Sequence, residues 1–213
     1  MEYFIFDTET TGKGTKDEVV QFAGIRFNSD FKIIGLVNWY CAITFPMDPE
    51  AVAVHGITDA QLSELANGRF LEDYLSQPEN SWLTTPQDLT FVAYNIKFDK
   101  RLTNQSLQNN GYGRLNFGRS QNLIPNGLTK GVHNVCAMDL STKVFNYQHG
   151  AKKLQEVINT QTKYTPKELD VMLTELCNKF GVKRYAGEFH DALYDSLALS
   201  MLIYGNRMYF VSR

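Results

Sequence analysis

Apolar and aromatic residues at the start of the chain fall in short runs without helical spacing, a pattern that predicts strands. Residues 2–7 are predicted to form a buried strand that ends at Asp7, and residues 19–27 and 33–44 the next two strands. A turn-prone Asn-Ser-Asp sequence lies between the second segment and the third. We therefore expect the chain to open with an antiparallel three-strand meander.

Helical spacing of apolar residues becomes common in the remainder of the chain. A second buried strand is predicted at residues 89–94. Thr165, Pro166 and Glu168 form a capping-box sequence, which predicts a helix that begins there and stops at Gly181. Helices are predicted over residues 58–66, 70–75, 97–108, 166–180 and 192–204, with further regular patterning at 135–139, 140–145 and 151–158.

Residues 109–134 interrupt this regular patterning with a different composition. Five of the fifteen glycines fall in the segment, among many asparagines. A structureless loop of that length is unusual within a compact domain. We expect one domain over residues 1–213 that carries a Gly/Asn-rich inserted loop at about 109–134.

Composition is that of a globular protein, with 43% hydrophobic residues among 213. No apolar run reaches the ~18 residues of a membrane span, and the first three residues lack the positive charge of a signal peptide. The three cysteines are widely spaced and include no Cys-x-x-Cys pair, which argues against a disulfide framework or a zinc knuckle. These features predict a cytoplasmic protein without a membrane partner.

The charge balance restricts how the chain can contact nucleic acid. It has 21 Lys and Arg against 23 Asp and Glu, a formal net charge of -2. Binding through bulk positive charge requires a strongly basic face, so any such contact is expected to be local. Lys97, Lys100 and Arg101, on the predicted helix that also carries Asp99, are candidates for contacts to a phosphate backbone.

Acidic residues stand at the ends of predicted elements in three separate segments. Asp7 and Glu9 are two residues apart, which puts both carboxylates on one side of an extended chain, although a solvated strand end has the same pattern. Asp99 falls in the first turn of a helix, where the helix dipole alone would favour an acid. His190 is expected ahead of the last helix and Asp195 within it, so both can face one cleft.

Four carboxylates and one histidine form a donor set that suits hard cations. Mg²⁺ and Mn²⁺ prefer oxygen ligands, and two such ions ~4 Å apart can hold the attacking and leaving oxygens of a phosphoryl displacement. Clustered carboxylates repel one another unless cations compensate them. A histidine with an ordinary pKa of ~6.5 can accept a proton near neutral pH. The set predicts hydrolysis of phosphodiester bonds.

At these residues the chain resembles the DEDDh family of 3'-5' exonucleases. Residues 4–12 (FIFDTETTG) match the first motif of the family, residues 95–99 (NIKFD) the second, and residues 190–195 (HDALYD) the third. Residues 55–58 (HGIT) match a tetrapeptide common in the proofreading branch, so the chain is similar to the proofreading epsilon subunit of bacterial DNA polymerase III. The resemblance covers nearly the whole chain, and the third motif begins with histidine, not tyrosine, which indicates the branch.

This resemblance implies a ribonuclease H-like α/β fold. Its central mixed five-stranded sheet would combine the antiparallel three-strand meander with parallel strands, and helices would flank it. The implied activity is release of 5'-mononucleotides from a free 3' end. The implied cofactors are two divalent cations, Mg²⁺ with Mn²⁺ as a substitute.

The resemblance also implies catalytic roles for five residues. Asp7, Glu9, Asp99 and Asp195 would be the metal ligands, with Asp7 shared between both ions. His190 would be the base that activates the attacking water.

Substrate contacts are implied for four further residues. Thr10 and Gly12 would lie against the terminal sugar, Ile57 near the last base, and Asn95 where it helps to orient the strand end. The acidic residue after the histidine of the third motif, Asp191, departs from the family pattern. It could cap the last helix, compete for metal or face solvent, and we expect the cap.

Three functions remain open on the sequence. The first is an exonuclease acting on single-stranded or frayed DNA, which the HGIT tetrapeptide favours. The second is an RNA 3'-end trimming enzyme like ribonuclease T. The third is a non-catalytic subunit that binds nucleic acid or a DNA polymerase of a replication or repair complex, and the presence of all five catalytic residues argues against it.

Overall fold

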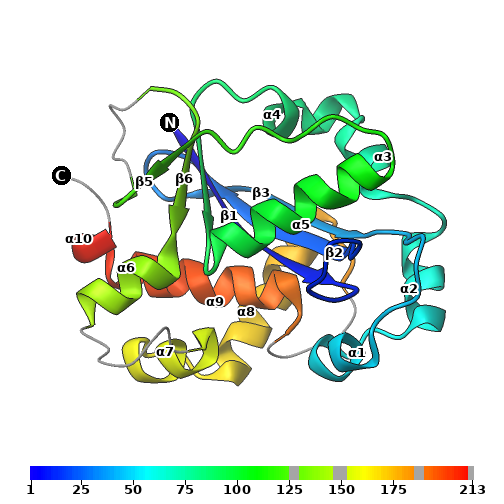
Figure 1. Cartoon of the computed structure of the whole chain (residues 1–213). Helices are drawn as coiled ribbons and strands as arrows, with labels where there is room; N and C mark the ends of the chain where they lie inside the picture. Colours follow the sequence, from blue (N-terminus) through cyan, green and yellow to red (C-terminus); the bar gives the residue numbers. More distant parts are fainter. Residues whose placement is uncertain (125–129, 146–152, 185–189, 211–213) are drawn as a thin grey trace.

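A six-stranded mixed sheet forms the centre of the computed structural model, which describes residues 1–124, 130–145, 153–184 and 190–210 (Figure 1). The strand order is β3-β2-β1-β4-β6-β5. The strands are β1 (Glu2–Thr10), β2 (Val19–Phe27), β3 (Ile33–Tyr40), β4 (Leu89–Ala93), β5 (Arg119–Gln121) and β6 (His133–Cys136).

Strand pairing confirms the antiparallel meander and corrects the number of strands. β2 pairs antiparallel with both β1 and β3, whereas β4 is parallel to β1 and β6, and β5 is parallel to β6. The expectation of five strands is wrong, because Arg119–Gln121 forms a sixth strand within the segment 109–134. The Asn134 side chain donates to the carbonyls of Phe117 (3.0 Å) and Gly118 (3.0 Å) and accepts from Ser120 (3.1 Å), which holds this short polar strand at the edge.

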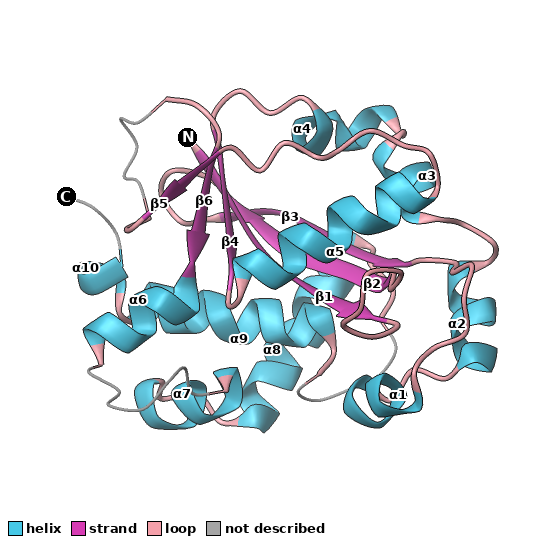
Figure 2. Cartoon of the chain, viewed as in Figure 1, coloured by secondary structure: helices cyan, strands magenta, loops and turns pink. Residues whose placement is uncertain are grey.

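Helices cover both faces of the sheet, as Figure 2 shows. They are α1 (Pro49–His55), α2 (Asp59–Ala66), α3 (Leu71–Leu75), α4 (Ser81–Thr84), α5 (Ile96–Asn109), α6 (Ala137–Val144), α7 (Leu154–Gln161), α8 (Pro166–Phe180), α9 (Ala192–Gly205) and α10 (Arg207–Phe210), with a 3-10 turn at Pro78–Asn80. In the described part of the chain, no helix has both the length and the apolar composition needed to cross a membrane.

Local capping sequences explain where several helices begin. The Thr165 hydroxyl accepts from the Glu168 amide and the Glu168 carboxylate accepts from the Thr165 amide, so the predicted capping box and the helix 166–180 are confirmed. The helix α1 was not predicted, and its first residue is Pro49. It stands at the first helical position behind the cap Asp48, whose carboxylate accepts from the Glu50 amide. The first residues of the regularly patterned segment 151–158 lie outside the described residues, and α7 begins at Leu154.

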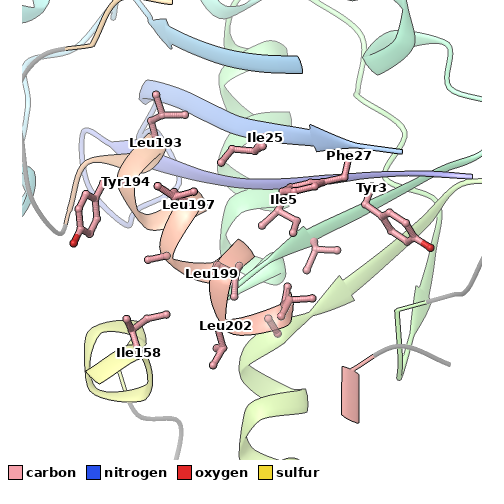
Figure 3. Close-up of a cluster of buried hydrophobic side chains, with 14 of the residues drawn as sticks. Tyr3, Ile5, Ile25, Phe27, Ile158, Leu193, Tyr194, Leu197, Leu199 and Leu202 are labelled. Atoms are coloured by element: carbon pink, nitrogen blue, oxygen red, sulfur yellow. The ribbon is translucent and has the colours of Figure 1, made fainter. Parts of the chain in front are cut away.

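The strand β1 separates two hydrophobic clusters because its side chains alternate between the faces of the sheet. Tyr3 and Ile5 pack with α9, α8 and α7 on one face (Figure 3), and Phe4 and Phe6 pack with α5 and α3 on the other. All four side chains are fully or almost fully buried. Each contributes about 1.5–3 kcal/mol of transfer free energy. This packing fixes where the residues that follow on β1 must lie.

Candidate active site

Two of the four candidate acids, Asp7 and Glu9, lie on β1. This strand continues to Thr10, three residues beyond its predicted end. Asp7 and Glu9 share the parity of Tyr3 and Ile5, so both carboxylates are on the α9 side of the strand. Glu9 pairs with Gln21 but the next residue, Thr10, pairs with Val19, so the ladder has a bulge at this point. Bulges of this kind re-aim side chains at functional sites.

Asp195, the acid of the third motif, lies in the first turn of α9. Asp191 caps this helix as expected: its carboxylate accepts from the amides of Leu193 (2.9 Å) and Tyr194 (3.3 Å). The side-chain amide of Gln21 on β2 accepts from the Ala192 amide (3.1 Å) and donates to Asp191 (3.3 Å), which fixes the start of the helix on the sheet.

Three carboxylates converge across the interface between β1 and α9. One ligand oxygen from each of Asp7, Glu9 and Asp195 lies within 4.8 Å of the other two. Asp195 Oδ1 is buried and has no hydrogen-bond partner among the described residues. A buried, unsatisfied carboxylate oxygen is costly unless a cation compensates it. The group therefore fits a hard divalent cation.

The fourth acid reaches the site from the opposite face of the sheet. Asp99 is buried in the first turn of α5, and the Thr8 hydroxyl on β1 donates to its carboxylate at 2.9 Å. The main-chain carbonyl of Asn95 begins this turn by accepting from the amides of Phe98 (2.8 Å) and Asp99 (3.4 Å). Asp99 lies outside the three-member group, yet its negative charge raises the pKa of Asp7.

Burial makes all four acids resist ionisation, and repulsion from neighbouring carboxylates adds to this effect at Asp7, Glu9 and Asp195. The pKa of Asp7 and that of Glu9 are raised well above their usual values, first by burial and then by the neighbouring carboxylates. Burial raises the pKa of Asp99 to about 7, against the hydrogen bond from Thr8. Burial also raises the pKa of Asp195 to about 8, against a hydrogen bond from the His190 backbone. Binding of a cation would release the shared protons.

His190 precedes the cap of α9, as expected, and is largely exposed to solvent; it is not among the residues that line the cleft described below. Its φ of 75° lies in the left-handed region, which histidine adopts more readily than most residues. Partial burial and the positive charge of Lys153 lower the pKa of the imidazole below 6.5. The side chain is therefore mainly neutral at pH 7 and can accept a proton.

A cleft of about 550 Å³ lies beside the acids, between the end of β1 and helix α1. Its lining residues are Thr8, Glu9, Thr10, Gly12, Lys13, Gly14, Asp17, Asp48, Glu50, Ala51, Val54, His55 and Phe98. Thr10 donates from its hydroxyl to the Gly12 carbonyl (2.8 Å), and a Cβ on Gly12 would stand 2.7 Å from the Asp17 carboxylate. The structure thus places both residues at the cleft, where the resemblance expects substrate.

Two other expected substrate residues do not line this cleft. Ile57 is only 4% exposed and packs with Val20, Tyr40 and Leu62 in a third hydrophobic cluster. Asn95 is exposed at the start of α5. The structure does not bring either side chain to the cleft wall, and their contacts with substrate stay predictions.

His55 lines the cleft and was not predicted to take part in the site. Its Nδ1 accepts from the Ile57 amide (3.0 Å), which leaves the proton on Nε2. Gly56 ends α1 with a φ of 73°, and Thr58 begins α2 with a capping box. The HGIT tetrapeptide is thus a compact connection between two helices. Burial and the charge of His190 lower the pKa of His55, so two imidazoles lie within electrostatic range of each other.

Comparisons with known proteins agree with this architecture. An exonuclease family model, that of RNase_T, matches residues 4–202. Exodeoxyribonuclease I of Haemophilus influenzae is 33% identical over 114 residues, which are 51% of this chain and 23% of that protein. The aligned part therefore spans about a quarter of the length of that relative.

Solved structures share the fold. Escherichia coli Exonuclease I in complex with a dA16 oligonucleotide superposes with a TM-score of 0.62 at 20% identity, over 98% of this chain and 42% of that one. Exonuclease X in complex with 5' overhanging duplex DNA superposes with a TM-score of 0.53 at 22% identity, over 97% of this chain and 92% of that one. The nuclease domain of 3'hExo, a DEDDh family member bound to rAMP, superposes with a TM-score of 0.55 at 17% identity, over 94% of this chain and 88% of that one.

The family model covers most of the chain, and the solved structures share the fold of its mixed sheet. Enzymes of this family normally use divalent metals, and Asp7, Glu9 and Asp195 form a cluster of carboxylates that could hold one. The chain belongs to the DEDDh family of 3'-5' exonucleases.

Proposed function

We propose that the protein hydrolyses phosphodiester bonds at the 3' end of single-stranded or frayed DNA and releases 5'-mononucleotides, with two Mg²⁺ ions as cofactors. The observation that carries the proposal is the convergence of Asp7, Glu9 and Asp195, with an unsatisfied buried oxygen on Asp195. Asp99, held by Thr8, would complete the set of ligands.

The residues of the chain divide the chemistry between them. Bound cations would stabilise the charge that develops on the phosphate and on the leaving oxygen. Neutral His190 would take a proton from the attacking water, whose oxygen forms a bond to phosphorus while the bond to the 3'-oxygen of the preceding nucleotide breaks. Thr10 and Gly12 would hold the terminal nucleotide in the cleft.

DNA is favoured over RNA by the relatives. The curated relative that is 33% identical over 114 residues is named an exodeoxyribonuclease. Exonuclease I and Exonuclease X were both solved in complex with DNA. The rAMP-bound neighbour is the observation in favour of an RNA-trimming enzyme. The resemblance to a polymerase subunit keeps a DNA polymerase or repair complex as a proposed partner.

The test is a panel of 5'-labelled single-stranded DNA, duplex DNA and RNA of one sequence, incubated with Mg²⁺, with Mn²⁺ and with chelator. We expect stepwise shortening from the 3' end of single-stranded DNA, 5'-mononucleotides as products, and no reaction with chelator. Asp7→Asn removes a charged ligand at constant volume and should abolish the reaction. Asp30→Asn changes an exposed acid in the β2–β3 turn and should not.

Two results would contradict the proposal. Faster shortening of RNA than of DNA would assign the enzyme to RNA. Equal turnover by Asp7→Asn and the wild type would show that the cluster of Asp7, Glu9 and Asp195 does not take part in the reaction.

A further inference from the structure

One face of α5 is entirely polar or cationic. Lys97, Lys100, Arg101, Asn104, Gln105, Gln108 and Asn109 follow one another at helical spacing of three and four residues. The opposite face carries the buried Leu102 and Leu107. Since the helix buries its other face against the protein, packing does not require this arrangement of cations.

These seven residues, with Thr15 and Arg114, line a groove of about 510 Å³. No carboxylate is among the nine lining residues. Lys97, Lys100 and Arg114 form no ion pair with any residue in the described part of the chain. A protein of net charge -2 therefore has four cations, those of Lys97, Lys100, Arg101 and Arg114, in one groove without compensating acids.

The walls of the groove are fixed to α5 by hydrogen bonds. Arg101 donates to the carbonyls of Lys13 (3.1 Å) and Gly14 (3.2 Å), and Gln105 donates to the carbonyl of Asp17 (2.6 Å). On the other side Asn104 accepts from the Leu115 amide at 2.7 Å. Arg101 thus has a structural task, whereas Lys97, Lys100 and Arg114 are available to a ligand.

The groove adjoins the catalytic cleft. The loop between β1 and β2 stands between them, because Gly12, Gly14 and Asp17 line the cleft and Thr15 lines the groove. The Asp17 carboxylate faces the cleft side, where it accepts from the Thr11 hydroxyl (2.9 Å) and the Gly14 amide. The residues that line the groove include no acid up to the loop that separates it from the cleft.

We propose that this groove binds the phosphates of the substrate strand behind its 3'-terminal nucleotide; the inference rests on the proposed function and deepens it. From Lys97 to Gln108 the helix rises about 16 Å at 1.5 Å per residue. That length accommodates at most about five phosphates of a stacked strand at 3.4 Å per step. Lysine and arginine side chains supply contacts of this kind without reading sequence.

The test compares substrate lengths in the intact protein. Lys100→Gln combined with Arg114→Gln should lower the ratio of kcat/KM on a twelve-nucleotide single strand to that on a dinucleotide by about tenfold. The slope of log(kcat/KM) against log(salt) on the long strand should become shallower by about 1.4, at ~0.7 for each lost phosphate contact on a single strand. Lys167→Gln with Lys179→Gln, two exposed lysines on α8, is the matched control and should leave the ratio unchanged.

The outcomes separate this inference from the proposed function. If the wild type degrades neither substrate, the proposed function fails. If it degrades both and the groove variant keeps the wild-type ratio and salt slope, the groove inference is overturned. A loss confined to duplex substrates would also overturn it, since the groove would then contact the complementary strand.

Discussion

At the scale of single residues, a different neighbour opposes the effect of burial at each of two acids in the site. The Thr8 hydroxyl favours the ionised form of Asp99, and the His190 backbone favours that of Asp195. Both pKa values are nonetheless raised, to about 7 and about 8, because burial is the larger effect. The site is therefore prepared for a cation that displaces protons.

His190 can be tested without disturbing the backbone. His190→Asn retains a residue that tolerates the left-handed conformation, whereas alanine would add strain at a φ of 75°. We expect kcat to fall by about 10²–10⁴-fold because the general base is lost. The measurement is kcat against pH at saturating Mg²⁺.

The wild-type profile should rise through a pKa below 6.5, since burial and Lys153 favour the neutral imidazole. The variant should lose this rising limb. Thermal unfolding should show the two proteins equally stable. A variant that keeps both the rate and the limb would exclude His190 as the base.

At the scale of elements, β1 and α9 form the frame that holds the carboxylates. Alternation along β1 sends Asp7 and Glu9 toward α9, while Thr8, on the other face, contacts Asp99 on α5. The start of α9 is in turn bound to β2 through Gln21. The relative position of two elements therefore decides the geometry of the site.

Gln21→Ala tests this frame. It leaves the Ala192 amide and one acceptor position of Asp191 without their protein partner, so the free energy of unfolding should fall by about 1–3 kcal/mol. Displacement of the helix start should also weaken binding of Mn²⁺. Urea unfolding and a Mn²⁺ titration measure the two effects.

Gln155→Ala, an exposed residue on α7, is the control and should change neither quantity. If Gln21→Ala unfolds at the same urea concentration and binds Mn²⁺ as tightly as the wild type, Gln21 does not hold the start of α9 on the sheet.

At the scale of the whole molecule, the buried acids link stability to pH and to metal. A carboxyl group whose pKa is higher in the folded protein than in the unfolded chain stabilises the fold below its unfolded value of 3.8, and this stability is lost as pH rises through the folded value. For Asp99 and Asp195 the loss is complete above about 7 and 8.

The metal-free protein should consequently melt at least about 5 °C lower at pH 8.5 than at pH 5.5. Mn²⁺ at 100 times its Kd should restore about 2.7 kcal/mol at the higher pH. Calorimetry in chelator and in Mn²⁺ measures both. Asp195→Asn, which cannot ionise, should show a smaller pH effect than Glu175→Gln, an exposed control; equal pH dependence in the two variants would refute the linkage.

Local chemistry allowed much of this to be read from the sequence. The bounds of β2 and the capping box at Thr165 match the structure, because each depends on neighbours along the chain. The family was also predicted from the sequence, since its motifs keep their order. The predicted residues Asp7, Glu9 and Asp195 come together as expected, while the roles assigned to them stay predictions.

Long-range packing decided the rest. The sequence Arg-Ser-Gln of the edge strand β5 carries no strand pattern. The strand forms because it pairs with β6 and because Ser120 donates a hydrogen bond to the Asn134 side chain. Ile57 packs in a hydrophobic cluster with Val20 and Tyr40 and does not line the cleft. Of the HGIT tetrapeptide, His55 lines the cleft instead.

The sequence by itself determined which residues are available for the chemistry and which face of each helix is apolar. Only the tertiary structure decided that the polar face of α5 lines a groove beside the cleft and that Asp195 Oδ1 is buried without a described partner. The physical reason is that periodicity fixes the orientation of side chains about one element, whereas the partner of each face depends on how all the elements share the core.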